Sequence, residues 1–271
     1  MSGTGGARNV RHWHTMETLP TEEASGEFAR CWAAAGQHLD QLTSGHDMAW
    51  MRAQLVPPYL EHLSFRIGNQ LVFVRLEDVA GAIEVPGSRA ELQRIAAACG
   101  GVACLMPMRR RVGRWEPAEP GWGLVDVQTG APVHPPALPT NEPVEMSVWE
   151  LQDLAVQVVR RALEREGREI ISWQGDPDRH PAIWFNGDSG PEWVVVGFAR
   201  YPRRDAYPPA DLAAIAERCG RHARRGHLAS VAFASAGEAE GGSEDGEPLP
   251  LLRGAPLMVA FAGLAEHNPD R

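Results

Sequence analysis

Apolar residues gather along the chain in short runs that alternate with segments of helical spacing. Residues 193–199 are an apolar run of strand length, residues 211–224 place apolar side chains at helical intervals, and residues 228–234 are a second run. Continuous apolar runs are typical of buried strands, and intervals of three and four residues are typical of helices. This stretch therefore predicts a strand, a helix and a second strand.

The same succession occurs earlier in the chain, at residues 71–74, 91–99 and 102–106. The two helical segments also share the spacing of their apolar and small residues, which end in Cys-Gly in both. The shared positions are Leu92, Ile95, Ala96, Cys99 and Gly100 in the first segment and Leu212, Ile215, Ala216, Cys219 and Gly220 in the second. We interpret this as an internal duplication.

The duplication divides the chain into four parts. Residues 1–20 are expected to be a flexible N-terminal lead, because small polar residues dominate their beginning. Residues 21–131 are the first α/β half, residues 132–146 a proline-rich linker, and residues 147–271 the second α/β half. The predicted fold class is mixed α/β, with each half a mixed sheet flanked by helices.

Capping residues predict where several helices begin. Ser88 and Ser147 are each followed three residues later by Glu, which is the pattern of a capping box. Amphipathic spacing predicts a helix over residues 22–42, and a second helix is expected over residues 47–56.

Four apolar runs, of which the third overlaps the run at residues 193–199, predict strands in the second half. The first three, residues 169–173, 182–185 and 192–198, are separated by Gly, Asp and Pro, and Asn186-Gly187 is expected to be a hairpin turn. The fourth, residues 256–261, is the expected final strand of the sheet.

Charge and composition limit the classes of partner. The formal net charge is −9, which disfavours nucleic acid as a partner because nucleic-acid binders need clustered cations. Five acids lie in the glycine-rich residues 237–247, which are expected to be mobile. No apolar run reaches the length of a membrane span and the N-terminus lacks an apolar signal core, so we expect a cytoplasmic protein without membrane association.

The order of elements over residues 147–236 is helix, three strands, helix, strand. Within it, Val194–Pro202 is a strand that ends in Arg200-Tyr201, and residues 230–235 are rich in small and hydroxyl side chains. This order and these features resemble the restriction-endonuclease-like (PD-(D/E)xK) superfamily, and more narrowly its Mrr-like branch. The resemblance implies that the first half is a degenerate copy of the same unit.

The catalytic residues that the resemblance implies are missing. The family uses two acidic groups and a lysine to hold Mg²⁺ and an attacking water. Alignment on Arg200-Tyr201 puts Gly197 at the acidic position and Ala199 at the lysine position. The chain contains no lysine at all, since all 26 cationic residues are Arg, and an Arg stays protonated where a lysine could act as a base. We therefore expect no catalytic residue, no metal and no cofactor.

A rearranged acidic site is the alternative. Asp176, Asp178, His180 and Glu192 lie near the predicted strands of the second half and could hold Mg²⁺ for a metal-dependent nuclease or other hydrolase. In the competing structural interpretation, Asp176-Pro177-Asp178 is a turn in which an Asp side chain holds the local backbone.

The largest concentration of basic residues is the candidate binding surface. If the end of the strand and the following helix lie side by side, these residues make one positive patch that could receive phosphate or an acidic partner. The candidate binding residues are Arg200, Tyr201, Arg203, Arg204, Arg218, Arg221, Arg224 and Arg225.

Four cysteines are scattered along the chain, and apolar surroundings favour reduced core thiols for three of them. The alternative is a zinc site of Cys99, Cys104, Cys219 and His222, although the spacing of its first two residues is not a usual zinc knuckle.

The leading hypothesis is a non-catalytic binding protein that acts through protein–protein contact, such as an inhibitor, an immunity-type protein or a partner subunit. A metal-dependent nuclease and a nucleic-acid-binding module without catalysis are the alternatives. The sequence indicates neither the identity of the partner nor the oligomeric state.

Overall fold

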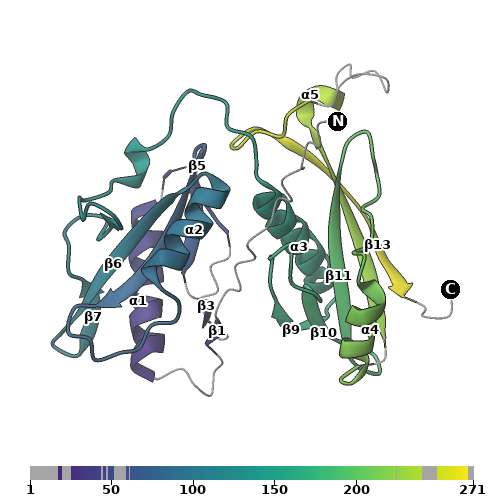
Figure 1. Ribbon diagram of the computed structural model, residues 1–271, viewed down its shortest axis with the longest axis horizontal. Coiled ribbons are helices and arrows are strands. Elements are labelled where there is room, and N and C mark those ends of the chain that lie inside the picture. Colours follow the sequence, from purple (N-terminus) through teal and green to yellow (C-terminus); the bar gives the residue numbers. More distant parts are fainter. Residues whose placement is uncertain are drawn as a thin grey trace, which may run out of the picture.

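The computed structural model of the chain describes two α/β halves joined by a proline-containing segment (Figure 1). The described residues are 18–19, 26–43, 45–46, 48–51, 59–60, 62–223, 225–239 and 249–267. Most of the predicted N-terminal lead and the acidic residues 240–248 lie outside this set. Within the lead, Thr18–Leu19 form strand β1, which pairs with β3 (Tyr59–Leu60).

The first half contains a mixed sheet in the order β2-β4-β5-β6-β7, with β8 beside β6. Helices α1 and α2 pack on its opposite faces. The elements are α1 (Gly26–Thr43), β2 (Met48–Trp50), β4 (Leu63–Ile67), β5 (Gln70–Asp78), α2 (Arg89–Cys99), β6 (Val102–Arg111), β7 (Arg114–Pro117) and β8 (Val125–Asp126).

The second half contains a mixed sheet in the order β9-β10-β11-β12-β13. Its helices α3 and α4 pack on opposite faces, and α5 is a single turn after β12. The elements are α3 (Val148–Arg165), β9 (Glu169–Trp173), β10 (Ile183–Gly187), β11 (Gly190–Arg200), α4 (Leu212–Gly220), β12 (Gly226–Ser235), α5 (Ala236–Ala239) and β13 (Leu257–His267).

The two halves have the same topology. In each, a helix is followed by three antiparallel strands, a helix, a strand parallel to the third, and an antiparallel outer strand. The predicted α/β class with two related halves is therefore confirmed. A shared evolutionary origin by duplication stays an interpretation of this agreement.

Alternation along the central strand explains how each sheet holds two helices. In β5, Val72 and Val74 face α1, and Phe73 faces α2. In β11, Val194 faces α3 and Val195 faces α4. Because successive side chains of a strand point to opposite faces, an uninterrupted apolar run is what a strand covered on both faces requires.

Several element predictions are wrong in detail. Residues 48–50 form strand β2 rather than a helix over 47–56; β2 pairs with β4, and sheet pairing outweighs a weak helical pattern. The β10–β11 turn is Asp188-Ser189, since Gly187 pairs with Gly190, so Asn186-Gly187 belongs to the strand. Helix α4 ends earlier than the predicted 211–224, and β13 is longer than the predicted 256–261.

Both predicted capping residues are N-caps. The Ser88 hydroxyl accepts a hydrogen bond from the Glu91 amide, and Ser147 and Glu150 form a reciprocal capping box. These contacts satisfy amide groups that have no partner within the first helical turn. Helix α2 ends at Gly100, whose φ of 59° is the left-handed conformation that glycine adopts without strain.

Helices α2 and α3 lie between the two sheets, where the halves meet (Figure 1). Trp149 at the start of α3 packs on Phe73 of the first sheet, with ring centroids 5.4 Å apart. Nearby, the guanidinium of Arg253, which precedes β13, is buried and donates to the carboxylate of Glu150 at 2.8–3.0 Å. The same guanidinium also donates to the carbonyl oxygens of Cys99 and Gly100 at the end of α2.

The proline-containing linker is attached to both halves. The Asn69 side chain in the β4–β5 turn donates to Thr140 and to the carbonyl oxygen of Glu142 at 2.8–3.0 Å. Farther along, the Met146 amide donates to Leu251 in the segment before β13. The linker also contains a short 3-10 turn, Pro135–Ala137. No helix among the described residues is long and apolar enough to cross a membrane.

Candidate functional site

Corresponding positions in the two halves can be identified from a pair of glycines. Gly101 and Gly226 each lie beside the central strand where the parallel strand begins. A Cβ on Gly101 would lie 2.6 Å from the ring of Phe73, and one on Gly226 would lie 2.0 Å from the ring of Trp193. Gly101 lies opposite Leu71 of β5, and Gly226 lies opposite Trp193 of β11. Counting along both central strands from this pair makes Arg75 the counterpart of Gly197 and Glu77 the counterpart of Ala199.

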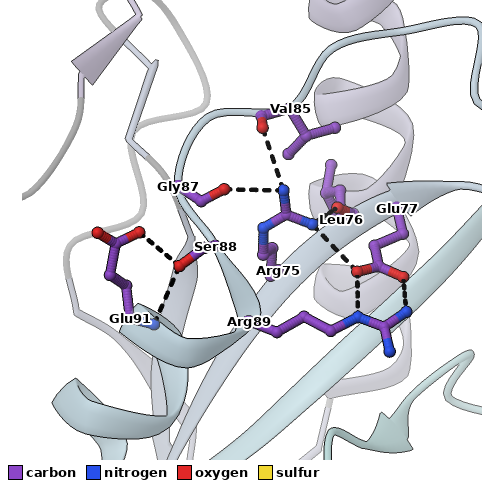
Figure 2. Close-up of polar contacts among 8 residues, drawn as sticks. All are labelled: Arg75, Leu76, Glu77, Val85, Gly87, Ser88, Arg89 and Glu91. Carbon is purple, nitrogen blue, oxygen red and sulfur yellow. Dashed lines mark hydrogen bonds and ion pairs between the residues drawn. The ribbon is translucent and has the colours of Figure 1, made fainter.

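In the first half this position is filled by a partly buried arginine (Figure 2). The Arg75 guanidinium donates to the carbonyl oxygens of Val85 and Gly87 at 3.1 and 3.0 Å, and to the carboxylate of Glu77 at 3.1 Å. It thereby holds the loop between β5 and α2 against the end of the strand. Asp78 holds the same loop by accepting from the amides of residues 80, 82 and 83.

A second arginine completes the cluster in the first half. Arg89, in the first turn of α2, binds the Glu77 carboxylate through both Nε and a terminal nitrogen, at 2.7 and 2.5 Å (Figure 2). This bidentate pairing raises the pKa of the Arg89 guanidinium. The Glu77 carboxylate is thus paired with two guanidinium groups.

In the second half the same positions carry no polar side chain. Gly197 has no side chain and Ala199 is a fully buried methyl group, so no ion cluster forms. The loop after β11 instead lies against Gly197, where an added Cβ would be 2.9 Å from Ala206. A groove of about 790 Å³ lies between this loop and the faces of β11, β12 and β13. Helix α4 is only nine residues long and covers the part of the sheet around Trp193 and Val195, which leaves the groove exposed.

Small side chains line the floor of the groove, and polar side chains line its rim. The floor residues are Gly197, Ser230, Ala232, Ala234, Ala260 and Ala265. The rim contains Tyr201, Arg203, Arg204, Asp205 and Tyr207, and the Arg203 guanidinium lies over the Tyr207 ring at 4.7 Å. The Ala206 amide donates to the Ser230 hydroxyl at 2.7 Å, which fastens the rim loop to the floor.

The predicted basic patch is divided between two ends of the sheet. Arg203 and Arg204 follow β11 at the rim of the groove, whereas Arg225 precedes β12 at the opposite end. The β11–β12 ladder runs from Trp193 to Arg200, so seven residues, or about 23 Å, separate the two ends. One continuous patch is therefore not formed, because the intervening α4 runs between the ends.

Ion pairing further separates the candidate arginines. Arg200 pairs with Glu145, and Arg225 lies 3.5 Å from Glu192 and 3.4 Å from Glu266. Arg218 and Arg221 are on and just after α4, and Arg224 lies outside the described residues. Of the candidate set, Tyr201, Arg203 and Arg204 line the groove.

The alternative acidic site is not assembled. Asp176, Asp178 and His180 lie in the β9–β10 loop, and among the described residues no three His, Cys, Asp or Glu side chains form a group that could hold a metal. Asp176 accepts from the Asp178 amide at 3.0 Å, which is the turn contact expected from the structural interpretation. Burial lowers the pKa of His180.

Glu192 takes part in a different cluster. Its carboxylate is buried and accepts from His227 Nε2 at 2.6 Å, at the end of β11 far from the groove. Arg168, Asp188 and Arg225 lie around the same small charged pocket. Glu192 is therefore hydrogen-bonded to His227 of β12 and does not lie with the acids of the β9–β10 loop.

All four cysteines are free and buried. Burial raises the pKa of the Cys31 and Cys104 thiols to about 12, so both stay protonated at neutral pH. The alternative zinc site is wrong, since Cys99 and Cys104 are in the first half and Cys219 is a buried residue of α4 in the second.

Part of the second half has relatives. Residues 149–267 match a protein family described as a domain of unknown function (DUF8840). That segment contains the whole groove and its rim, and it leaves out the Arg75 cluster of the first half. No curated protein and no solved structure matches the chain.

The floor of the groove was not found by sequence reasoning. Its residues are Gly, Ala and Ser, which carry no recognisable chemistry one by one. A signal does exist, because residues 230–234 alternate small side chains with large ones, and five of the six residues at 260, 262, 263, 265, 232 and 234 are Ala. A strand with one small-residue face lets another chain approach the sheet closely.

Proposed function

We propose that the protein is a non-catalytic binding protein and that the groove on the second sheet holds a segment of a partner protein. The observation that carries the proposal is the groove itself, an exposed apolar floor of three strands beneath a cationic rim. Isolated apolar residues on a surface need no explanation, but a contiguous apolar depression with a polar rim is typical of a recognition site.

The chemistry of the rim favours an acidic partner segment with apolar side chains. Arg203 and Arg204 make no ion pair with the other described residues, and one acid, Asp205, lies beside them. The chain as a whole carries a charge of −9, so a basic rim is a local exception to its surface. Carboxylates of a partner would be drawn to this rim while its apolar side chains cover the alanines of the floor.

The proposal retains the restriction-endonuclease-like relationship as its evolutionary background. The α-β-β-β-α-β order of α3 to β12 supports it, as does the position of Gly197 and Ala199 at the end of the central strand. Replacement of polar catalytic groups by small ones at that position would convert a catalytic depression into a binding groove.

A selection from random peptides displayed on phage tests the proposal. We expect the wild-type protein to enrich peptides that combine apolar residues with Asp or Glu, and affinity to fall at least about tenfold in Ala232→Phe, which fills the floor. The matched control is Ala98→Phe on the exposed surface of α2, which should bind like the wild type.

Charge reversal tests the role of the rim. Arg203→Glu together with Arg204→Glu should shift the selected peptides from acidic to basic ones. Enrichment that is equal for wild type and Ala232→Phe would overturn the proposal. So would Mg²⁺-dependent cleavage of DNA, which would instead favour the nuclease alternative.

A further inference from the structure

Strand β13 is the long apolar outer strand of the second sheet, and its outer edge has no partner strand among the described residues. Strand β13 is eleven residues long and pairs with β12 along its inner edge. No charged residue and no proline occurs from Leu257 to Ala265. Two of its large side chains, Met258 and Val259, are 47% and 45% exposed. An edge of this kind presents unpaired backbone amides and carbonyls that can pair with another strand.

The other outer strands of the two sheets are protected in ways that β13 is not. Strand β7 has four residues and includes Arg114 and Glu116, and β2 has three residues. Strand β9 has five and begins with Glu169. Short length and charge are the devices by which natural proteins prevent pairing at sheet edges.

We infer that β13 pairs with the β13 of a second copy of this chain. The regular part of the strand is Leu257–Phe261, because a bulge follows in which Ala262 and Gly263 lie opposite Ser230. Antiparallel pairing about Val259 sets the two Val259 residues opposite each other and Met258 opposite Ala260. The pair joins the two five-stranded sheets into one sheet of ten strands.

The distribution of charge permits a second copy as the partner at this edge. Each chain has a net charge of −9, so two copies repel each other over much of their surfaces. The nine residues from Leu257 to Ala265 carry none of this charge. Pairing about Val259 keeps the two Glu266 carboxylates more than about 40 Å apart along the strands.

Symmetry is the reason for choosing a second copy as the partner. Antiparallel pairing of two identical strands about a two-fold axis uses both free edges at once, so the assembly closes as a dimer. Facing β-branched side chains such as the two Val259 residues are favourable cross-strand pairs. A strand from another protein could also pair with this edge, but its side chains would have to be complementary to β13. The uncharged residues of β13 are complementary to those of a second β13.

The two-fold axis runs perpendicular to the joined sheet, so both grooves open on the same side of it. The floor residue Ala260 lies in the paired part of β13 in each copy. The two grooves then flank the axis and can receive two linked partner segments together. The pairing itself does not depend on the proposed function of the groove.

Molar mass in solution tests the inference. We expect light scattering and sedimentation to give a dimer for the full chain at micromolar concentration, and a monomer for Val259→Lys. Two facing ammonium groups on the axis would repel each other, whereas Val259 is exposed enough for the lysine to remain solvated in the monomer. The matched control is Val79→Lys, which makes the same charge change at a residue 59% exposed in the first half and should remain dimeric.

Cross-linking tests the register of the pair. Opposite residues of antiparallel strands have Cα atoms about 4.5–5.5 Å apart, a separation that a disulfide can span. Val259→Cys should therefore form a covalent dimer under mild oxidation, and Val79→Cys should not; the four natural cysteines are buried. A monomeric wild type, a dimer that survives Val259→Lys, or a dimer in which Val259→Cys does not cross-link would each overturn the inference.

Discussion

The end of the central strand carries an ion cluster in the first half of the molecule and only small side chains in the second. In the first half, Arg75 and Glu77 occupy the end of β5 and fasten the following loop to it. In the second half, Gly197 and Ala199 occupy the same positions and the loop becomes the wall of a groove. The same topology thus gives a loop fastened by ion pairs in one case and a loop that borders a groove in the other.

The outer strand shows the same contrast. Beyond β6, the first half has the short strands β7 and β8, and the indole of Trp115 in β7 donates to Glu27 of α1. Beyond β12, the second half has the long uncharged β13. The groove and the long unpaired strand edge are therefore both in the second half.

The strongest test of the comparison is to put a first-half carboxylate into the second half. Ala199→Glu should lower the free energy of unfolding by about 3–5 kcal/mol, because the new carboxylate would be buried without the arginines that surround Glu77. Urea denaturation measures the loss. The exposed Ala262→Glu on β13 should be nearly neutral. A cost below about 1 kcal/mol for Ala199→Glu would contradict the closed packing at this position.

The paired glycines give the next largest effect. Gly226→Ala should cost about 3 kcal/mol, since its Cβ would overlap the buried Trp193 ring, which is held by a hydrogen bond to Ala223. Gly101→Ala should cost about 1–2 kcal/mol, because the contact with Phe73 is less severe. Thermal unfolding of both variants provides the comparison. Gly220→Ala, which meets no atom within 4 Å, should not be destabilising; equal behaviour of all three would refute the structural equivalence.

Removal of the loop fastening should have a smaller, localised effect. Arg75→Met should cost about 2 kcal/mol, because the carbonyl oxygens of Val85 and Gly87 lose their donor. Hydrogen exchange should accelerate at residues 79–88 and remain unchanged at residues 201–211. Arg94→Met, which removes an exposed ion pair at 3.6 Å, is the control and should change stability by less than about 0.5 kcal/mol. Exchange that rises equally in both loops would contradict the local role of Arg75.

The smallest effect is a gain of stability in the first half. Val112 in the β6–β7 turn has a φ of 48°, a conformation that costs a β-branched residue energy, and its side chain is 97% exposed. Val112→Asn creates the Asn-Gly turn preferred at this geometry and should raise the free energy of unfolding by about 1 kcal/mol. Val79→Asn, also at an exposed valine but without a positive φ, should bring no such gain when measured by the same denaturation.

Sequence patterns predicted the repeated core because that core depends on local periodicity. The buried positions of α2 and α4, including Ile95 and Ile215, were placed correctly from their spacing. The capping serines were also identified correctly, since a cap depends on residues three apart in the chain. These features are set by neighbours in sequence, which a single chain displays directly.

The parts that could not be predicted depend on distant partners. Nothing near Arg75 in sequence shows that its guanidinium binds the carbonyl oxygens of Val85 and Gly87, ten and twelve residues later. The basic residues from Arg200 to Arg225 are close in the chain, yet a full strand length separates their two ends. The groove was missed because it consists of small residues from three strands, whose arrangement is a property of the whole sheet.

The contacts of Arg253 couple the unfolding of the two halves. Its guanidinium joins the negative end of the α2 dipole to the carboxylate at the positive end of α3, so the second half stabilises the C-terminus of a helix in the first half. The segment 149–267 would lose two of these acceptors and the cover over Trp149 if it were separated from the rest. The two halves are therefore expected to melt in a single calorimetric transition, as one cooperative unit in spite of their repeated architecture.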